Sequence, residues 1–243
     1  MFNLTGKTAL VTGSSQGIGT GIAKCLAEHG AHVFVHGSRN LQKVQAAADS
    51  IGKNASCVVG DLTQDGCAKR FYAQTGDIDI LVLNASMQFR HAWNQITSEE
   101  FDTQVRINLK SAMELIQIYE PSMEKKHWGR IVTVGSVQQY KPHKDMMIYA
   151  ATKAAQMNMV QNLAKQLAPL GITVNNMAPG VIDTPRNADA LADPVYHQKV
   201  MEGIPVGFAG TPADCAAPVL LLCSEEGRYI NGIDLVVDGG MHL

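Results

Sequence analysis

The fold of this chain is decided by the stretch Thr8-Ala9-Leu10-Val11-Thr12-Gly13-Ser14-Ser15-Gln16-Gly17-Ile18-Gly19. Its first five residues form a short β-rich run, and its glycines then follow the spacing G-x-x-x-G-x-G, which differs from the common dinucleotide fingerprint G-x-G-x-x-G. Glycines let the backbone turn sharply, and they bring amide N–H groups close to a diphosphate at a helix N-terminus. The stretch therefore predicts a strand, a tight turn and a helix, with either a nucleotide or no ligand at the turn.

The same alternation of short apolar runs and helical patterns continues along the whole chain. Strands are expected at residues 8–12, 32–36, 55–59, 78–83, 130–134, 172–176 and 233–237, and helices at 17–29, 41–50, 98–125 and 147–170. Near-continuous Val/Ile/Leu runs are typical of parallel strands that are covered on both faces. Stacked βαβ units predict a doubly wound parallel sheet in a three-layer α/β/α sandwich of Rossmann-like type. Since 243 residues contain no linker or repeat, a single domain is expected.

Two segments carry additional local signals. Thr97 and Glu100 predict a capping box at the start of the first long helix, and Pro121 is expected to kink or end that helix. Residues 183–210 hold three prolines and three glycines and break the strand–helix rhythm. Long insertions in compact domains are functional or disordered, and here we expect a substrate lid.

Composition excludes several classes of protein. A net charge of −2 gives no electrostatic reason to expect nucleic acid or an anionic membrane as partner. The N-terminus lacks the features of a signal peptide, and no apolar run approaches the roughly 20 residues that span a bilayer. A soluble, cytoplasmic protein is therefore expected. The five cysteines form no C-x-x-C pair and the eight histidines no cluster, so we expect no metal site.

Tyr149 and Lys153 form a candidate acid–base pair. They stand four residues apart in a predicted helix and so share one face. A free tyrosine has a pKa of about 10, and a cation held close to it favours the phenolate, as general acid–base catalysis near neutral pH requires. The spacing is common by chance, and taken alone a solvated helix face is its simpler interpretation.

Several motifs occur together in one order and separation. They are Thr12-Gly13-x-x-x-Gly17-Ile18-Gly19, Asn84-Ala85, Asn108, Ser136, Tyr149-x-x-x-Lys153, and Pro179-Gly180 with Thr184. Each is weak alone, but jointly they are specific. Over essentially its whole length the chain resembles the short-chain dehydrogenase/reductase family, which implies an oxidoreductase that uses a nicotinamide nucleotide.

The resemblance implies four catalytic residues. Tyr149 would be the general acid/base at the carbonyl or alcohol oxygen. Lys153 would lower the pKa of that phenol and bind the nicotinamide ribose. Ser136 would hold the substrate oxygen, and Asn108 would order a water that links Lys153 to solvent as a proton relay.

The resemblance also implies a set of cofactor contacts. These are Gly13, Ser15, Gln16, Gly17, Ile18, Gly19, Ser38, Arg39, Asp61, Leu62, Asn84, Ala85, Tyr149, Lys153, Pro179, Gly180, Ile182 and Thr184. An enzyme that prefers NAD usually carries an acidic residue where Ser38 stands, to accept the ribose hydroxyls. The Arg39 guanidinium that follows suits the 2′-phosphate of NADP, so we expect NADP rather than NAD. The glycine turn offers no second basic residue, since Ser15 and Gln16 are neutral, and Ser86 departs from the family's N-A-G pattern.

The substrate is less well specified. Ser136, Gln138 and Tyr149 are expected to contact it, and Arg186 could either meet a carboxylate or stay solvated. The segment 136–142 is somewhat similar to that of sugar and sugar-acid dehydrogenases, which favours a sugar, sugar acid or polyol. A 3-oxoacyl thioester is the alternative substrate, and a nucleotide-binding regulator without turnover is the alternative class of function. The resemblance also implies a homotetramer.

Overall fold

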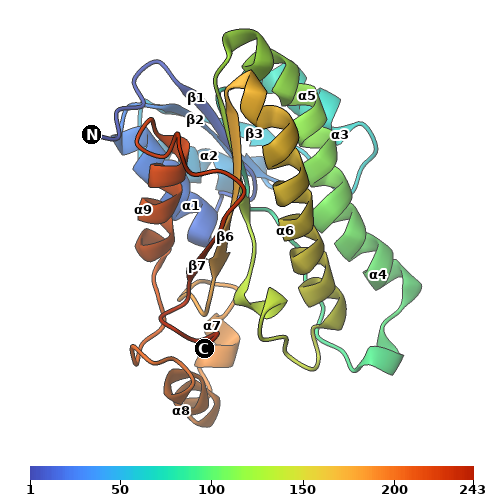
Figure 1. Ribbon diagram of the computed structural model, residues 1–243. Coiled ribbons are helices and arrows are strands. Elements are labelled where there is room, and N and C mark those ends of the chain that lie inside the picture. The colour runs from blue at the N-terminus through green and yellow to red at the C-terminus, as the bar shows by residue number, and fades with distance from the viewer.

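The chain forms one parallel seven-stranded sheet between two layers of helices (Figure 1). The computed structural model describes residues 1–243, apart from the side chains of residues 189 and 190. The strands are β1 (Thr8–Val11), β2 (His32–Gly37), β3 (Ala55–Val59), β4 (Ile80–Leu83), β5 (Gly129–Val134), β6 (Ile172–Pro179) and β7 (Asp234–Val237). Their order is β3-β2-β1-β4-β5-β6-β7. All seven predicted strands and the doubly wound topology are confirmed.

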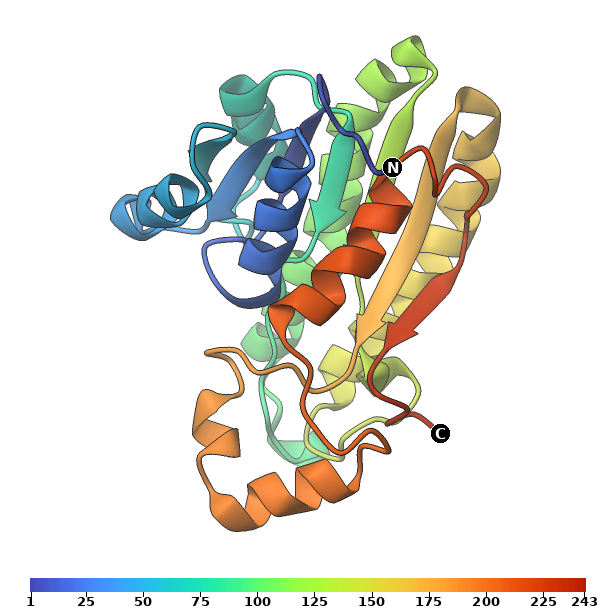
Figure 2. The same ribbon diagram turned by 90° about the vertical axis from the view of Figure 1, so that its left-hand side faces the viewer.

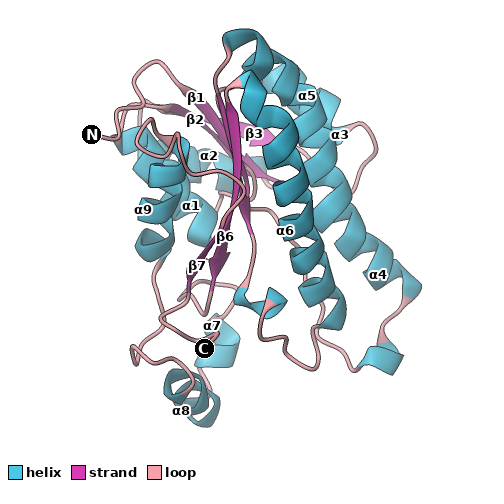
Figure 3. Ribbon diagram, in the orientation of Figure 1, coloured by secondary structure: helices cyan, strands magenta, loops and turns pink.

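Helices cover both faces of the sheet (Figure 3). Each layer buries a separate apolar cluster against it. One face carries α1 (Gly17–Glu28), α2 (Leu41–Ile51) and α9 (Pro212–Cys223). The other carries α3 (Cys67–Thr75), α5 (Ser111–Lys126) and α6 (Met147–Leu167). Within the described part of the chain, no helix combines the length and the apolar character that crossing a bilayer requires.

The first long helix is interrupted by a π turn. The predicted capping box is present, with Glu100 N–H donating to Thr97 Oγ1 at 3.2 Å and Thr97 N–H to Glu100 Oε2 at 3.0 Å. Helix α4 (Ser98–Val105) passes into the π turn η2 (Arg106–Lys110) and then into α5. Pro121 does not end α5, which continues to Lys126. Single π turns often mark functional positions, and this one contains the predicted catalytic residue Asn108.

Residues 183–210 lie beyond the carboxyl edge of the sheet (Figure 2). They contain two short helices, α7 (Ala188–Leu191) and α8 (Pro194–Glu202). The ends of the segment are closed by backbone hydrogen bonds, from Asp183 N–H to Gly210 O at 2.7 Å and from Gly210 N–H to Val181 O at 3.0 Å. The segment thus starts and ends at neighbouring points beside the sheet. Its role as a lid stays a prediction.

The sheet has one topological switch point. From β1 the chain proceeds outward to β2 and β3, and it then returns to β4 on the other side of β1. In doubly wound sheets the crevice outside the carboxyl ends of such strands is where ligands bind. The turns that follow β1 and β4 are therefore where a site is expected.

Candidate active site

A cavity of about 560 Å³ opens at the switch point. Its walls come from the glycine turn, from the loops after the central strands, from the start of α6 and from the segment 183–210. The predicted cofactor residues on these walls are Gly13, Ser15, Gln16, Gly17, Ile18, Ser38, Asp61, Leu62, Asn84, Ala85, Tyr149, Pro179, Gly180, Ile182 and Thr184. Gly19, Arg39 and Lys153 do not line the cavity.

The glycine turn brings backbone close to backbone at the head of α1. Gly13 and Gly17 have φ values of +63° and +62°, which favour glycine. A Cβ on Gly13 would lie 2.9 Å from Ala85 Cα, and one on Gly19 would lie 2.5 Å from Asn84 Nδ2. Gly19 therefore allows α1 to pack on the loop after β4 instead of facing the cavity. The first turn of α1 has no side-chain cap, so its amides suit a bound diphosphate.

A buried histidine that the sequence analysis did not identify supports this turn. Gly13 N–H donates to His36 Nδ1 at 2.9 Å, and His36 Nε2 lies 2.9 Å from Gly60 O. Because a carbonyl only accepts, Nε2 carries the proton and the imidazole is neutral. Burial lowers the pKa of His36, although the Gly60 carbonyl and Asp61 act in the opposite direction.

Arg39 is turned toward Asp61, which lines the cavity. Its Nε and Nη2 donate to Asp61 Oδ2 at 3.0 and 2.8 Å, while its side chain remains 80% exposed. Asp61 Oδ1 accepts from the backbone N–H and the hydroxyl of Thr63, at 2.9 and 2.7 Å. The predicted cofactor contacts Arg39 and Asp61 are thus joined in one ion pair.

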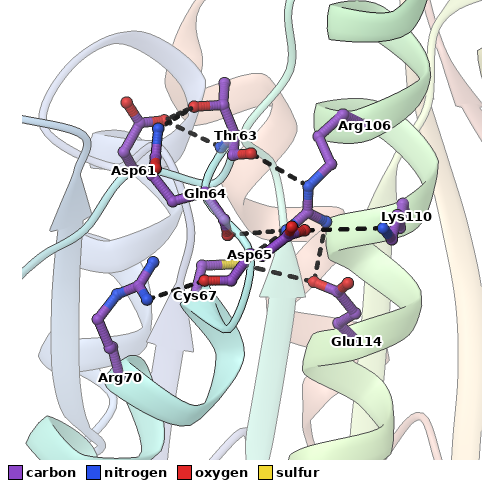
Figure 4. Close-up of polar contacts among 9 residues, drawn as sticks. All are labelled: Asp61, Thr63, Gln64, Asp65, Cys67, Arg70, Arg106, Lys110 and Glu114. Atoms are coloured by element: carbon purple, nitrogen blue, oxygen red, sulfur yellow. Dashed lines mark hydrogen bonds and ion pairs between the residues drawn. The ribbon is translucent and has the colours of Figure 1, made fainter.

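A second arginine, also missed in the sequence, holds the loop that carries Asp61 (Figure 4). Arg106, in the π turn, donates to the carbonyls of Thr63 and Gln64 at 3.2 and 2.8 Å. It also pairs with Glu114 Oε2 at 2.8 Å. One largely buried guanidinium therefore ties the loop after β3 to the long helix.

Tyr149 and Ser136 face the cavity together. The Tyr149 side chain is 6% exposed, two residues into α6, and Ser136 caps the short helix that follows β5. Burial raises the pKa of the Tyr149 phenol and is the largest effect on it. The charge of Arg186 and hydrogen bonds with Ser136, Ser86 and Arg186 lower the pKa by less. The net direction is opposite to the one predicted from the Tyr149/Lys153 spacing.

Lys153 lies behind Tyr149, at 1% exposure. Its Nζ is 5.6 Å from the centre of the Tyr149 ring and donates to Val134 O at 2.7 Å and to Gln156 Oε1 at 2.9 Å. Burial, with the positive charge of Arg186, lowers the pKa of Lys153 to about 7. The ammonium of this residue therefore titrates close to neutral pH.

Asn108 is fully buried and fixed at every polar side-chain atom. Its Oδ1 accepts from Met87 N–H at 2.9 Å, and its Nδ2 donates to Met87 O and Thr152 Oγ1 at 3.0 Å each. Its backbone carbonyl accepts from Gln156 Nε2 at 2.7 Å. The side chain thus positions the wall near Ser86, and the carbonyl faces Gln156.

Arg186 connects the segment 183–210 to the opposite wall. It donates from Nη1 to Ser86 Oγ and from Nη2 to Ser86 O, both at 2.9 Å. The departure from N-A-G at Ser86 therefore supplies a hydroxyl that accepts from Arg186. The predicted substrate residue Gln138 also lines the cavity, and its Oε1 accepts from His143 N–H at 2.6 Å.

Comparison with known proteins gives matches over nearly the whole chain. A family model described as enoyl-(acyl carrier protein) reductase matches residues 13–242. The human protein named dehydrogenase/reductase SDR family member 4 is 36% identical over 245 residues, covering 98% of this chain and 88% of that protein.

Solved structures agree closely with the fold. A 3-oxoacyl (acyl-carrier-protein) reductase from Agrobacterium tumefaciens C58, with NADP bound, has a TM-score of 0.94 and 37% identity, covering 98% of this chain and 95% of its own. A gluconate 5-dehydrogenase from Burkholderia cenocepacia J2315, in complex with NADP and tartrate, has a TM-score of 0.91 and 30% identity, covering 99% and 96%.

Proposed function

The chain belongs to the short-chain dehydrogenase/reductase family, and we propose that it is an NADP(H)-dependent oxidoreductase that interconverts a secondary alcohol and its ketone on a sugar, sugar acid or polyol. Enzymes of this family use NAD(P). The proposal adds the choice of NADP and the substrate class.

The observation that carries the reaction is the placement of Tyr149 and Ser136 on one wall, with Lys153 directly behind. Ser136 would hold the substrate oxygen, and Tyr149 would give a proton to that oxygen in reduction or take one in oxidation. NADP(H), when bound, supplies or accepts the hydride. A binding-only regulator needs no such phenol, so the arrangement favours turnover.

The preference for NADP rests on Ser38 and Arg39. Ser38 lines the cavity where an acid would repel a 2′-phosphate, and Arg39 is beside it at the entrance. The two solved relatives described above carry NADP, which supports the same choice.

The preference for a polyhydroxylated and acidic substrate rests on the polar end of the cavity. Gln138, His143, Asn187 and Arg186 line the cavity, and Arg186 is close enough to Tyr149 to lower the pKa of its phenol. These groups match hydroxyl and carboxylate oxygens better than an acyl chain. The gluconate 5-dehydrogenase relative, which holds tartrate, supports a sugar acid. A 3-oxoacyl thioester is the second candidate substrate, because another relative is a 3-oxoacyl reductase.

A substrate screen with NADPH and NADH in parallel tests the proposal. Aldonates, polyols and acetoacetyl thioesters would be compared, and we expect turnover with the first two groups and NADP(H). Tyr149→Phe should lower kcat by about 10²- to 10⁴-fold while NADPH binding, followed by fluorescence, stays unchanged. Lys153→Met should lower kcat and also weaken NADPH binding. The enzyme proposal fails if the wild type turns over no substrate, and the substrate proposal fails if only thioesters react.

We also propose a homotetramer. Exposed apolar side chains on α4, on α5, at the start of α6 and next to β7 support it, among them Phe101, Met113, Met147 and Ile233. Light scattering after size exclusion tests it, and a monomer would contradict it.

A further inference from the structure

The side-chain amide of Gln156 lies between Lys153 and Asn108. Gln156 is on α6 one turn after Lys153, at 1% exposure. Its Oε1 accepts from Lys153 Nζ at 2.9 Å, and its Nε2 donates to Asn108 O at 2.7 Å. The expectation from the sequence was that Asn108 orders a water that links Lys153 to solvent; here a side-chain amide joins the two residues directly.

The hydrogen bonds of the Lys153 ammonium limit where a water can bind to it. A lysine ammonium has three N–H donors. Lys153 uses one on Val134 O and one on Gln156 Oε1. One remains, and it is the one that a bound ribose would take. A water that accepts from Lys153 Nζ would therefore have to displace Val134 O, the Gln156 amide or the ribose.

The amide also differs chemically from a water. A water can accept a proton on one side while it releases another. An amide accepts at oxygen and donates at nitrogen, and it would have to pass through its imidic acid form to transmit a proton. The link from Lys153 to Asn108 can therefore fix the ammonium in place but is a poor path for protons.

We propose that Gln156 is a positioning residue that holds the Lys153 ammonium where a relay water was expected, and that protons exchange with solvent through the cavity mouth beside Tyr149. This proposal rests on the proposed function for its catalytic meaning. In oxidation, Tyr149 in its deprotonated form would take the proton of the substrate hydroxyl, while bound NADP would accept the hydride from the same carbon. The phenol then releases that proton to water in the cavity, and reduction reverses both transfers.

The charge of Lys153 offers a direct test in the protein without nucleotide. Carbonyl acceptors favour the ammonium, and they oppose the burial and the Arg186 charge that lower the pKa of Lys153 to about 7. Among the described residues, Tyr149 and Arg186 are the titratable and charged groups that face this ammonium. Nitrogen NMR of labelled lysine, with the Nζ signal assigned through Lys153→Met, reports its titration midpoint.

Two substitutions should move this midpoint in opposite directions. Gln156→Leu removes one acceptor and should lower it, whereas Gln156→Glu adds a negative charge and should raise it. In the active enzyme the alkaline limb of kcat/KM should follow, with Gln156→Leu losing about tenfold more activity near pH 8 than near pH 6. Gln104→Leu, at a buried glutamine of α4, is the matched control.

Gln156→Ala extends the test. It makes room for a water between polar groups, and it should restore the midpoint toward the wild-type value. An unchanged Lys153 midpoint in a folded Gln156→Leu protein would overturn the proposal, even if the enzyme is active. Failure of the proposed function would instead appear as absent turnover in the wild type, with the NMR titration unaffected.

Discussion

Arg186 donates to Ser86 from both of its terminal nitrogens, to the hydroxyl and to the backbone carbonyl, each at 2.9 Å. The pair joins the segment 183–210 to the loop after β4 across the cavity, beside Tyr149. Arg186 also places a second cation near the buried Lys153, and this repulsion contributes to the low pKa of Lys153. An anionic group on the substrate would offset it.

Arg186→Gln should therefore weaken binding of carboxylate substrates selectively. Loss of a charge-assisted pair should raise KM for an aldonate about tenfold or more, while KM for a neutral polyol of equal length changes little. Steady-state kinetics on the two substrates measures the difference. Arg90→Gln is the control, because Arg90 lines the same cavity. Equal losses on both substrates would show that Arg186 only supports the wall.

Arg39→Leu should change the choice of nucleotide. Removing the guanidinium takes away the partner for a 2′-phosphate and frees Asp61 Oδ2 to accept from ribose hydroxyls. We expect KM for NADPH to rise about tenfold and KM for NADH to stay constant or fall. Parallel titrations with both nucleotides measure this, with Arg70→Leu as an exposed control. If KM rises by the same factor for both nucleotides, Arg39 does not contact the 2′-phosphate.

The sequence predicted the sheet well because parallel strands are continuous apolar runs whose length and spacing are local properties. No helix was predicted for α9, because Pro218 and an uninterrupted apolar run obscure the helical periodicity. Packing against α1 stabilises this segment as a helix. The motif residues meet at one cavity because their order along the chain matches the sheet topology. His36, Arg106 and Gln156 were missed for the opposite reason. Each forms a hydrogen bond to a residue that is distant in sequence, and the only signal was a polar residue within a buried pattern.

Arg106→Met should weaken nucleotide binding through the loop that carries Asp61. The substitution removes the donors to Thr63 O and Gln64 O and leaves Glu114 without its partner. We expect KM for NADPH to rise more than kcat falls, together with a lower Tm. Arg106→Lys keeps the charge but not the forked geometry, and it should recover Tm better than it recovers KM. A change in Tm alone would restrict Arg106 to a structural role.

His36 should make stability fall on the acid side of neutrality. Burial lowers its pKa below the ordinary value of 6.5, so the folded state stays neutral while the unfolded state takes up a proton as the pH drops through that range. The unfolded state then binds more protons, and the free energy of unfolding decreases toward lower pH until the folded-state pKa is reached. His36→Gln retains an acceptor for Gly13 N–H and a donor for Gly60 O, but it cannot titrate. Denaturant unfolding of both proteins between about pH 5 and 7.5 should show a flatter profile for the variant. Parallel profiles would mean that the pKa of His36 is the same in the folded and unfolded states and that other groups set the acid limit.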